Sequence, residues 1–161
     1  MIEWFHATSA QPYRATVRVD SMVLYFVGEG NDEGVRGDIA FAQAIWETGW
    51  FSFPSGGTVS ASDNNFGGMG AGNGTVARFP DAATGVRAHI QHLRAYADAT
   101  VTVSNLANPL VDPRFTYVTP KGKAPDWQDM GNGNWAADPR YAAKIIGLYN
   151  DLRDFAGLPP V

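Results

Sequence analysis

Apolar residues recur at helical spacing in four stretches of the chain, and these stretches predict four main helices. They cover about residues 20–30, 38–49, 82–97 and 138–157. Residues that commonly cap helices stand at their ends. The clearest start is Asp138, an N-cap that is followed by Pro139 at the first helical position. Helices are therefore expected to dominate the fold.

The segments between these helices lack a sustained period. Residues 1–17 are interpreted as an irregular lead-in, and residues 98–137 as a long loop broken by prolines, with one helical turn near Trp127. Residues 52–80 are rich in glycine, and their only strand-like pieces are Thr58–Ser60 and Thr75–Phe79. The pattern predicts one mainly α (α+β) domain over residues 1–161, with a small β-lobe after the second helix.

Composition narrows the class of protein. Of 161 residues, 45% are apolar and 17% are charged, which is typical of a single folded domain with its own core. The net charge is −4 and basic residues do not cluster, which argues against a nucleic-acid partner. Cysteine is absent, which excludes disulfides and thiolate metal sites. No apolar run is long enough to span a membrane, and we expect no secretion signal in this chain.

One carboxylate, Glu47, stands at the end of the otherwise apolar second helix. Helical spacing places Ala40, Gln43 and Ala44 on its face, with Trp50 just beyond the turn. These neutral neighbours exclude water from the carboxyl, and the helix dipole disfavours an anion in the last turn. Both effects keep a proton on Glu47 near neutral pH, as a general acid for glycosidic bond cleavage requires. The alternative is a solvated surface residue.

Three short motifs lie in order along the chain, at residues 43–50, 64–68 and 135–144. They read Gln-Ala-Ile-Trp-Glu-Thr-Gly-Trp, Asn-Asn-Phe-Gly-Gly and Trp-Ala-Ala-Asp-Pro-Arg-Tyr-Ala-Ala-Lys. They resemble the Gln-Ala-x-x-Glu-Ser/Thr-Gly-Trp, Asn-Asn-Leu/Phe-Phe-Gly and Tyr-Ala-Thr-Asp-Pro-x-Tyr-Ala-x-Lys segments of bacterial glucosaminidases that cut peptidoglycan, glycoside hydrolase family 73. The resemblance spans about residues 34–155.

The resemblance implies a lysozyme-like helical domain with a substrate groove between an α-lobe and a small β-lobe. It implies hydrolysis of the β-1,4 bond after N-acetylglucosamine in the wall glycan, with Glu47 as the essential acid. It also implies a tyrosine near the active site. The first tyrosine of the third motif is Trp135 here, and Tyr141 must take its place if that tyrosine does chemistry. Tyr141 then faces the groove and bonds Glu47 or the acetamido group; its alternative is half-buried packing.

A second carboxylate, present in the β-lobe of some family members, is harder to place. Asp63 is the only acidic residue between Phe51 and Phe79, and Asp81 lies just beyond. Asp63 either activates water or steadies positive charge at the anomeric carbon, or it forms a turn by bonding its own loop backbone. If Asp63 does no chemistry, the acetamido group of the substrate acts as nucleophile and a single protein carboxylate suffices. We favour this last route.

Five further residues are candidates for binding substrate, each with a structural alternative. Trp50 and Trp135 are candidate platforms for sugar stacking, or else buried aromatic residues. Asn65 is either a turn residue or an amide donor to an N-acetyl group. Phe66 either contacts sugar or closes the base of its loop. Gln43 either orients the catalytic carboxyl or fills a helix interface.

We expect no metal and no cofactor. His89 and His92 are three residues apart on the third helix, but no third ligand is indicated nearby. Residues 63–67 lack the alternating ligands and terminal Glu of a calcium loop. The expected partner is the peptidoglycan glycan strand, attacked at the bacterial cell wall by a monomeric phage endolysin or autolysin. The alternatives are a muramidase or lytic transglycosylase on a related fold, and an inactive glycan-binding module.

Overall fold

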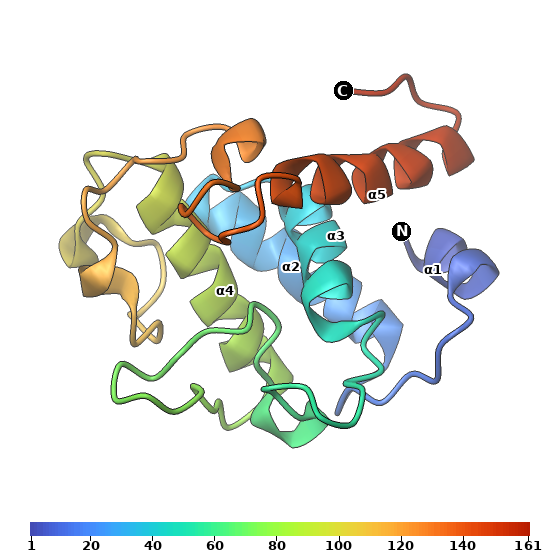
Figure 1. Ribbon diagram of the computed structural model, residues 1–161, viewed down its shortest axis with the longest axis horizontal. Helices are drawn as coiled ribbons and strands as arrows, with labels where there is room; N and C mark the ends of the chain where they lie inside the picture. The colour runs from blue at the N-terminus through green and yellow to red at the C-terminus, as the bar shows by residue number, and fades with distance from the viewer.

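The computed structural model describes residues 1–161, and five α-helices form its framework (Figure 1). These are α1 (Ile2–Thr8), α2 (Val19–Glu33), α3 (Gly37–Thr48), α4 (Ala82–Ala97) and α5 (Tyr141–Phe155). Four 3-10 turns lie between them: η1 (Ala61–Asp63), η2 (Val103–Asn105), η3 (Phe115–Tyr117) and η4 (Trp127–Asp129). The mainly α prediction is confirmed, and so is the helical turn near Trp127. No helix is both long and apolar enough to cross a membrane.

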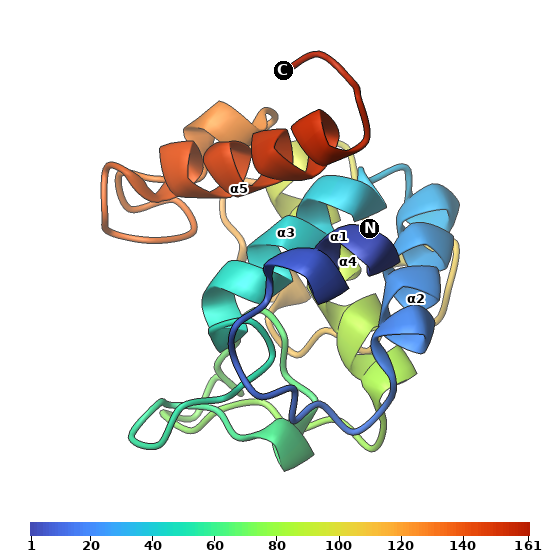
Figure 2. The ribbon, with the colours of Figure 1, turned by 90° about the vertical axis from the view of Figure 1, so that its right-hand side faces the viewer.

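Helix α3 is the centre of the fold because it is apolar on almost every side. It packs against α2 on one side and α5 on another, and α2 in turn packs against α4. In both views α5 lies across one end of the other helices, and residues 52–80 lie at the opposite end (Figures 1 and 2). The α2–α3 contact depends on Gly37, since a Cβ there would lie 2.1 Å from the carbonyl oxygen of Phe26.

The sequence predicts the end of α3 correctly, but it predicts the start of α5 too early. Helix α3 ends as predicted, with Gly49 in the left-handed conformation at φ 58°. Helix α5 begins at Tyr141, later than the predicted N-cap at Asp138. Asp138 and Pro139 instead form a separate turn, in which the Asp138 carboxylate accepts a hydrogen bond from the Arg140 N–H. The predicted N-cap is therefore wrong, because the capping contact of Asp138 closes a turn that leads into the helix.

The expected irregular lead-in over residues 1–17 is wrong for its first half, because α1 forms there. Trp4 and Phe5 of this helix are 1% and 3% exposed. Their rings contact Trp50, with centroids 5.5 and 5.8 Å apart. A helix of two turns is too short to show a sustained period, and burial of its aromatic side chains stabilises it instead.

The expected strands at residues 58–60 and 75–79 do not form, and only an isolated bridge joins Gly70 and Val76. Side chains hold this segment together in place of a strand ladder. The Asn65 amide donates to the carbonyls of Met69 and Ala77, at 2.8 and 2.9 Å. Its oxygen accepts from the Met69 N–H. Backbone groups satisfied in this way have no need of a paired strand.

The long segment after α4 is fastened to the helices by the buried carboxylate of Glu33. Its side chain is inaccessible to solvent and accepts a 2.6 Å bond from Arg94 of α4. The other oxygen accepts from the backbone N–H groups of Ala107 and Asn108. A buried charge with this many donors is well compensated, and it fixes the loop that leads toward η3.

Candidate active site

Glu47 lies in the last turn of α3, and its two carboxyl oxygens have different surroundings. Oε1 accepts hydrogen bonds from the Tyr141 hydroxyl and, at 3.1 Å, from the indole nitrogen of Trp135. Oε2 has no hydrogen-bond partner within the protein. It faces Gly68, where an added Cβ would lie 3.5 Å from it. The carboxyl is thus held on one side and open on the other.

Burial raises the pKa of Glu47 above its ordinary value, although the bonds from Tyr141 and Trp135 act in the opposite direction. Oε1 already faces two donors, and a proton there would point at another hydrogen. The acidic proton therefore belongs on Oε2, the open oxygen. This arrangement can donate a proton outward and then stabilise the carboxylate that remains.

A chain of buried side chains supports Tyr141 from behind. The Tyr141 hydroxyl accepts a 2.8 Å bond from the Gln43 amide, and the Gln43 oxygen lies 2.8 Å from His89 Nε2. Burial lowers the pKa of His89 to about 3, and its Nδ1 has no partner. His89 is therefore neutral with its proton on Nε2, and every donor in the chain points toward Glu47. Burial and the neighbouring carboxyl raise the pKa of Tyr141 well above its usual range, which keeps the hydroxyl protonated.

The sequence predicted that Gln43 and Tyr141 approach Glu47, but it missed His89 as their support. In the sequence, His89 is a candidate only for metal binding together with His92. The structure separates the two histidines, because His92 Nδ1 lies 2.8 Å from the Asp112 carboxylate. No group of three or more potential ligand side chains gathers anywhere in the structure. The sequence does contain one indication of this contact, since His89 and Gln43 are both polar residues on otherwise apolar helix faces.

The indole of Trp135 packs against several aromatic side chains in tilted and T-shaped contacts. Its ring centroid lies 5.5 Å from that of His89, 5.1 Å from His92 and 5.4 Å from Tyr96. The backbone at Gly67 passes close to this ring, since a Cβ added there would lie 3.2 Å from an atom of the indole. The indole is thus fixed in the orientation that directs its N–H to Glu47.

Two pockets meet at Glu47 and Gly68. The first, of about 280 Å³, is lined by Gly67–Gly70, His92, Tyr96, Arg114, Trp135 and Ala136 as well as Glu47. The second, of about 400 Å³, is lined by residues 46–49 together with Phe53, Pro54, Gly57–Val59 and Gly68. We call them the arginine pocket and the loop pocket. Because both include Glu47 and Gly68, the open carboxyl oxygen has access to solvent-filled space in two directions.

Asp63 lies in a third pocket, which adjoins the loop pocket but does not include Glu47. One of its oxygens accepts from the backbone and hydroxyl of Ser60, both at 2.8 Å. The other oxygen lies 3.1 Å from Arg78. The Ser60 backbone bond, ahead of the Ser60 hydroxyl and Arg78, lowers the pKa of Asp63. The structure therefore gives this carboxylate a capping contact and an ion pair, and does not bring it to Glu47.

Three other candidates for substrate binding do not line the pockets at Glu47. Asn65 and Phe66 are fully buried, and Asn65 uses both amide hydrogens within its own loop. Trp50 packs against Trp4 and Phe5 of α1. Of the residues proposed around the acid, the structure brings together Glu47 with Gln43, Tyr141 and Trp135.

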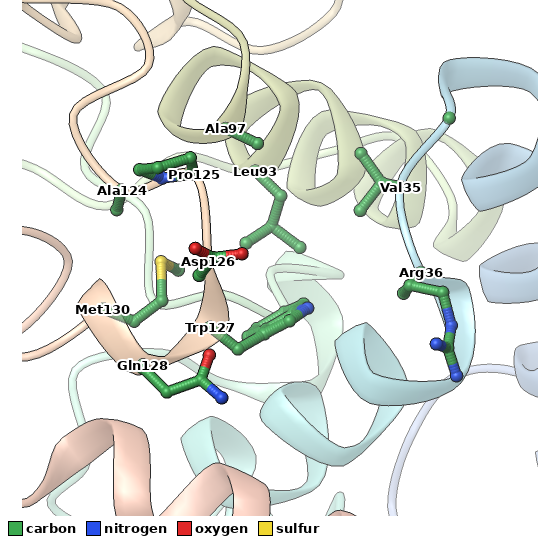
Figure 3. A pocket seen from close by; sticks show the side chains of 11 residues that line it. Val35, Arg36, Leu93, Ala97, Ala124, Pro125, Asp126, Trp127, Gln128 and Met130 are labelled. Atoms are coloured by element: carbon green, nitrogen blue, oxygen red, sulfur yellow. The ribbon is translucent and has the colours of Figure 1, made fainter. Parts of the chain in front are cut away.

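A further pocket of about 260 Å³ lies apart from this site (Figure 3). It is formed where the start of α3 approaches the end of α4 and η4. In Figure 3 Leu93 points toward the ring of Trp127, and Met130 lies beside them. It shares no residue with the two pockets at Glu47.

Comparisons with known proteins identify the family to which the chain belongs. The family model described as mannosyl-glycoprotein endo-beta-N-acetylglucosaminidase matches residues 24–154. The chain therefore belongs to this glucosaminidase family, a family of glycoside hydrolases that act on peptidoglycan.

A curated relative is an uncharacterized protein of Borreliella burgdorferi (strain ATCC 35210 / DSM 4680 / CIP 102532 / B31), which is 37% identical over 139 residues. The match covers 85% of this chain and 64% of the relative, and the chain thus spans less than two thirds of that protein's length. No solved structure matches the chain.

Proposed function

We propose that this protein is an endo-β-N-acetylglucosaminidase that cleaves the β-1,4 bond after N-acetylglucosamine in peptidoglycan, with Glu47 as the general acid. One observation carries the proposal. The carboxyl of Glu47 has a raised pKa and an open oxygen at the junction of two pockets, while its other oxygen is held by two donors. Membership of the glucosaminidase family supports the same substrate.

The arginine pocket and the loop pocket together form the substrate groove, as in a lysozyme-like domain. A glycan strand that crosses Gly68 would place one sugar in each pocket and the linking oxygen over Oε2 of Glu47. Gly68 permits this approach because it has no side chain between the backbone and the carboxyl. The monomer then acts at the bacterial cell wall, as a phage endolysin or an autolysin.

The first chemical step transfers the proton from Oε2 to the glycosidic oxygen as the bond from that oxygen to the anomeric carbon breaks. Glu47 becomes a carboxylate at this moment. The hydrogen bonds from Tyr141 and Trp135 to Oε1 strengthen because they now meet a full negative charge. Gln43 and His89 act as positioning residues, since they hold the Tyr141 hydroxyl in the donating orientation.

The positive charge at the anomeric carbon is met by the substrate's own acetamido oxygen, which forms a bond to that carbon. Water then opens this cyclic intermediate, and Glu47 accepts the proton of the water as general base. This route needs no second carboxylate. The contacts of Asp63 favour it, because Ser60 and Arg78 bind both Asp63 oxygens. If Asp63 does assist, it acts on water that enters from the neighbouring third pocket.

Digestion of purified peptidoglycan followed by mass spectrometry of the fragments tests this proposal. The wild-type protein should release fragments with reducing-end N-acetylglucosamine, and Glu47→Gln should release none. Glu3→Gln is the matched control, because it removes the same charge from an exposed position on α1. Reducing muramic acid would indicate a muramidase, and an anhydro-muramic end a lytic transglycosylase. Absence of any cleavage by the wild-type protein would indicate a glycan-binding module.

A further inference from the structure

The arginine pocket contains a guanidinium group that has no partner. Arg114 forms no ion pair and no side-chain hydrogen bond, and its Nε atom is buried without an acceptor. The guanidinium lies over the Tyr117 ring, 5.4 Å from its centroid, and Nη1 would be 3.5 Å from a Cβ added at Gly70. Tyr117 on one side and the Gly70 backbone on the other therefore place the guanidinium in the pocket wall.

The nearest acidic side chain is already engaged. Asp112 is completely buried, and one of its oxygens lies 2.8 Å from Nδ1 of His92. Its other oxygen accepts from the backbone N–H of Arg114, not from the guanidinium. Burial raises the pKa of Glu47, the remaining carboxyl in this pocket, and its hydrogen bonds come from Tyr141 and Trp135 and not from Arg114. The guanidinium therefore has no anionic partner within the protein, and a negatively charged ligand in the pocket would supply one.

His92 adds a second polar group on the same wall. Because Asp112 engages Nδ1, the ring is held in one orientation by this bond and by its contacts with Trp135 and Tyr96. Nε2 makes no hydrogen bond within the protein. It can therefore contact a polar group of a ligand in the pocket.

We infer that the arginine pocket binds a carboxylate carried by the muramoyl residue of the glycan, with Arg114 as the principal donor and His92 beside it. The inference rests on the proposed function, in which the substrate alternates two sugars. N-acetylglucosamine carries no ionisable group, whereas the muramoyl residue carries a lactyl carboxyl or the carboxylates of an attached peptide. A planar guanidinium matches a carboxylate with two parallel hydrogen bonds.

This assignment also sets the direction of the strand. If cleavage follows N-acetylglucosamine, the sugar on the leaving side of the bond is the muramoyl residue. The arginine pocket is then the leaving-group side of Glu47, and the loop pocket holds the N-acetylglucosamine whose acetamido group reacts.

Titration calorimetry on the Glu47→Gln protein tests the inference without hydrolysis. Three tetrasaccharides serve as probes: a wall glycan with free lactyl carboxylates, the same glycan with peptide stems, and an all-N-acetylglucosamine oligomer. Adding Arg114→Gln should weaken binding of one or both carboxylate-bearing probes about tenfold to a hundredfold, the factor for one charge-assisted hydrogen bond. Binding of the uncharged oligomer should stay within about twofold, which is small beside that factor.

The probe that responds identifies the source of the carboxylate, lactyl or peptide. Arg18→Gln removes the same charge from a side chain that is 84% exposed, and it should leave all three affinities unchanged. Arg114→Lys keeps the charge without the planar fork and should give a smaller loss, and it carries the test if the glutamine variant does not fold. Equal weakening of all three probes, or of none, would overturn the inference. Cleavage that survives Glu47→Gln overturns the proposed function instead, and the two failures are therefore distinguishable.

Discussion

Replacing Tyr141 by phenylalanine removes one oxygen atom that serves two neighbours. The hydroxyl donates to Glu47 Oε1 and accepts from the Gln43 amide. Tyr141 is 4% exposed and Gln43 is fully buried. The change leaves a buried amide hydrogen without an acceptor, which costs about 1–3 kcal/mol of unfolding free energy. Urea denaturation should show this loss as a lower midpoint with an unchanged slope.

The same change should alter catalysis in a specific direction. The Tyr141 bond lowers the pKa of Glu47, and its removal should raise that pKa further. Loss of the acid proton sets the alkaline limb of kcat/KM, and this limb should therefore move to higher pH. Meanwhile kcat at the optimum should fall about 10- to 100-fold, because the carboxylate formed in the transition state loses a charge-assisted donor worth about 1.5–3 kcal/mol.

Tyr149→Phe provides the matched control on the same helix. Tyr149 is 2% exposed, and its hydroxyl bonds Asp38 and Arg36 rather than the acid. This variant should lose about 1 kcal/mol of stability with no change in the pH profile. The measurements are turbidity loss of wall suspensions from pH 4 to 9 and urea unfolding. An alkaline limb that stays in place or moves to lower pH in Tyr141→Phe would refute the reasoning, as would an equal shift in Tyr149→Phe.

Two further predictions concern the same carboxyl. Because burial raises the pKa of Glu47, the folded protein holds this proton more tightly than the unfolded chain does. The stability that results is fully present below the unfolded pKa of about 4.3, and it is lost as pH rises through the folded pKa. Glu47→Gln should therefore be more stable than the wild type at pH 7 and similar at pH 4, and thermal melts that show the reverse would contradict the raised pKa. Gly68→Ala should lower kcat/KM at least about tenfold, since its Cβ would stand 3.5 Å from Oε2 in the path of the substrate. Gly74→Ala is its control, with a similarly positive φ and no atom within 4 Å, and equal activity loss in both would count against the open-oxygen assignment.

The sequence allowed the helices and the burial of Glu47 to be predicted because their signals are local. The residues of α4 were predicted to the end residue, and Gly49 marked the end of α3. Glu47 stands out in the sequence because its apolar helix face and its motif both lie between Ala40 and Trp50. The same local reasoning expected desolvation to raise the pKa of Glu47, and burial is its largest cause in the structure.

The remaining site contacts could not be predicted, since they join residues far apart in the chain. Nothing near Gln43 indicates that its amide bridges His89 and Tyr141, which are 46 and 98 positions away. Residues 75–79 are strand-like in sequence, but a strand needs a partner strand. Here the Asn65 side chain binds the Ala77 carbonyl in place of a partner. Trp50 is an aromatic residue close to Glu47 in the sequence. Only the position of α1 shows that its ring packs against Trp4 and Phe5 and does not line the pockets at Glu47.

The backbone just after Glu47 explains why α1 matters to the site. Gly49, Trp50 and Phe51 all have positive φ, at 58°, 63° and 54°. For the two aromatic residues this conformation costs about 1–2 kcal/mol each, and it persists only where the surroundings over-determine it. Phe51 is fully buried, and the ring of Trp50 is held by Trp4 of α1.

The strained turn therefore depends on a helix that lies outside residues 24–154, the range of the family match. It reverses the chain immediately after the acid, and this reversal brings residues 53–59 back beside Glu47 as one wall of the loop pocket. The Glu-Thr-Gly-Trp motif therefore ends α3 abruptly as well as carrying the proposed acid. Its tryptophan secures the turn from outside the pocket, while the glutamate inside keeps one oxygen bound and the other free.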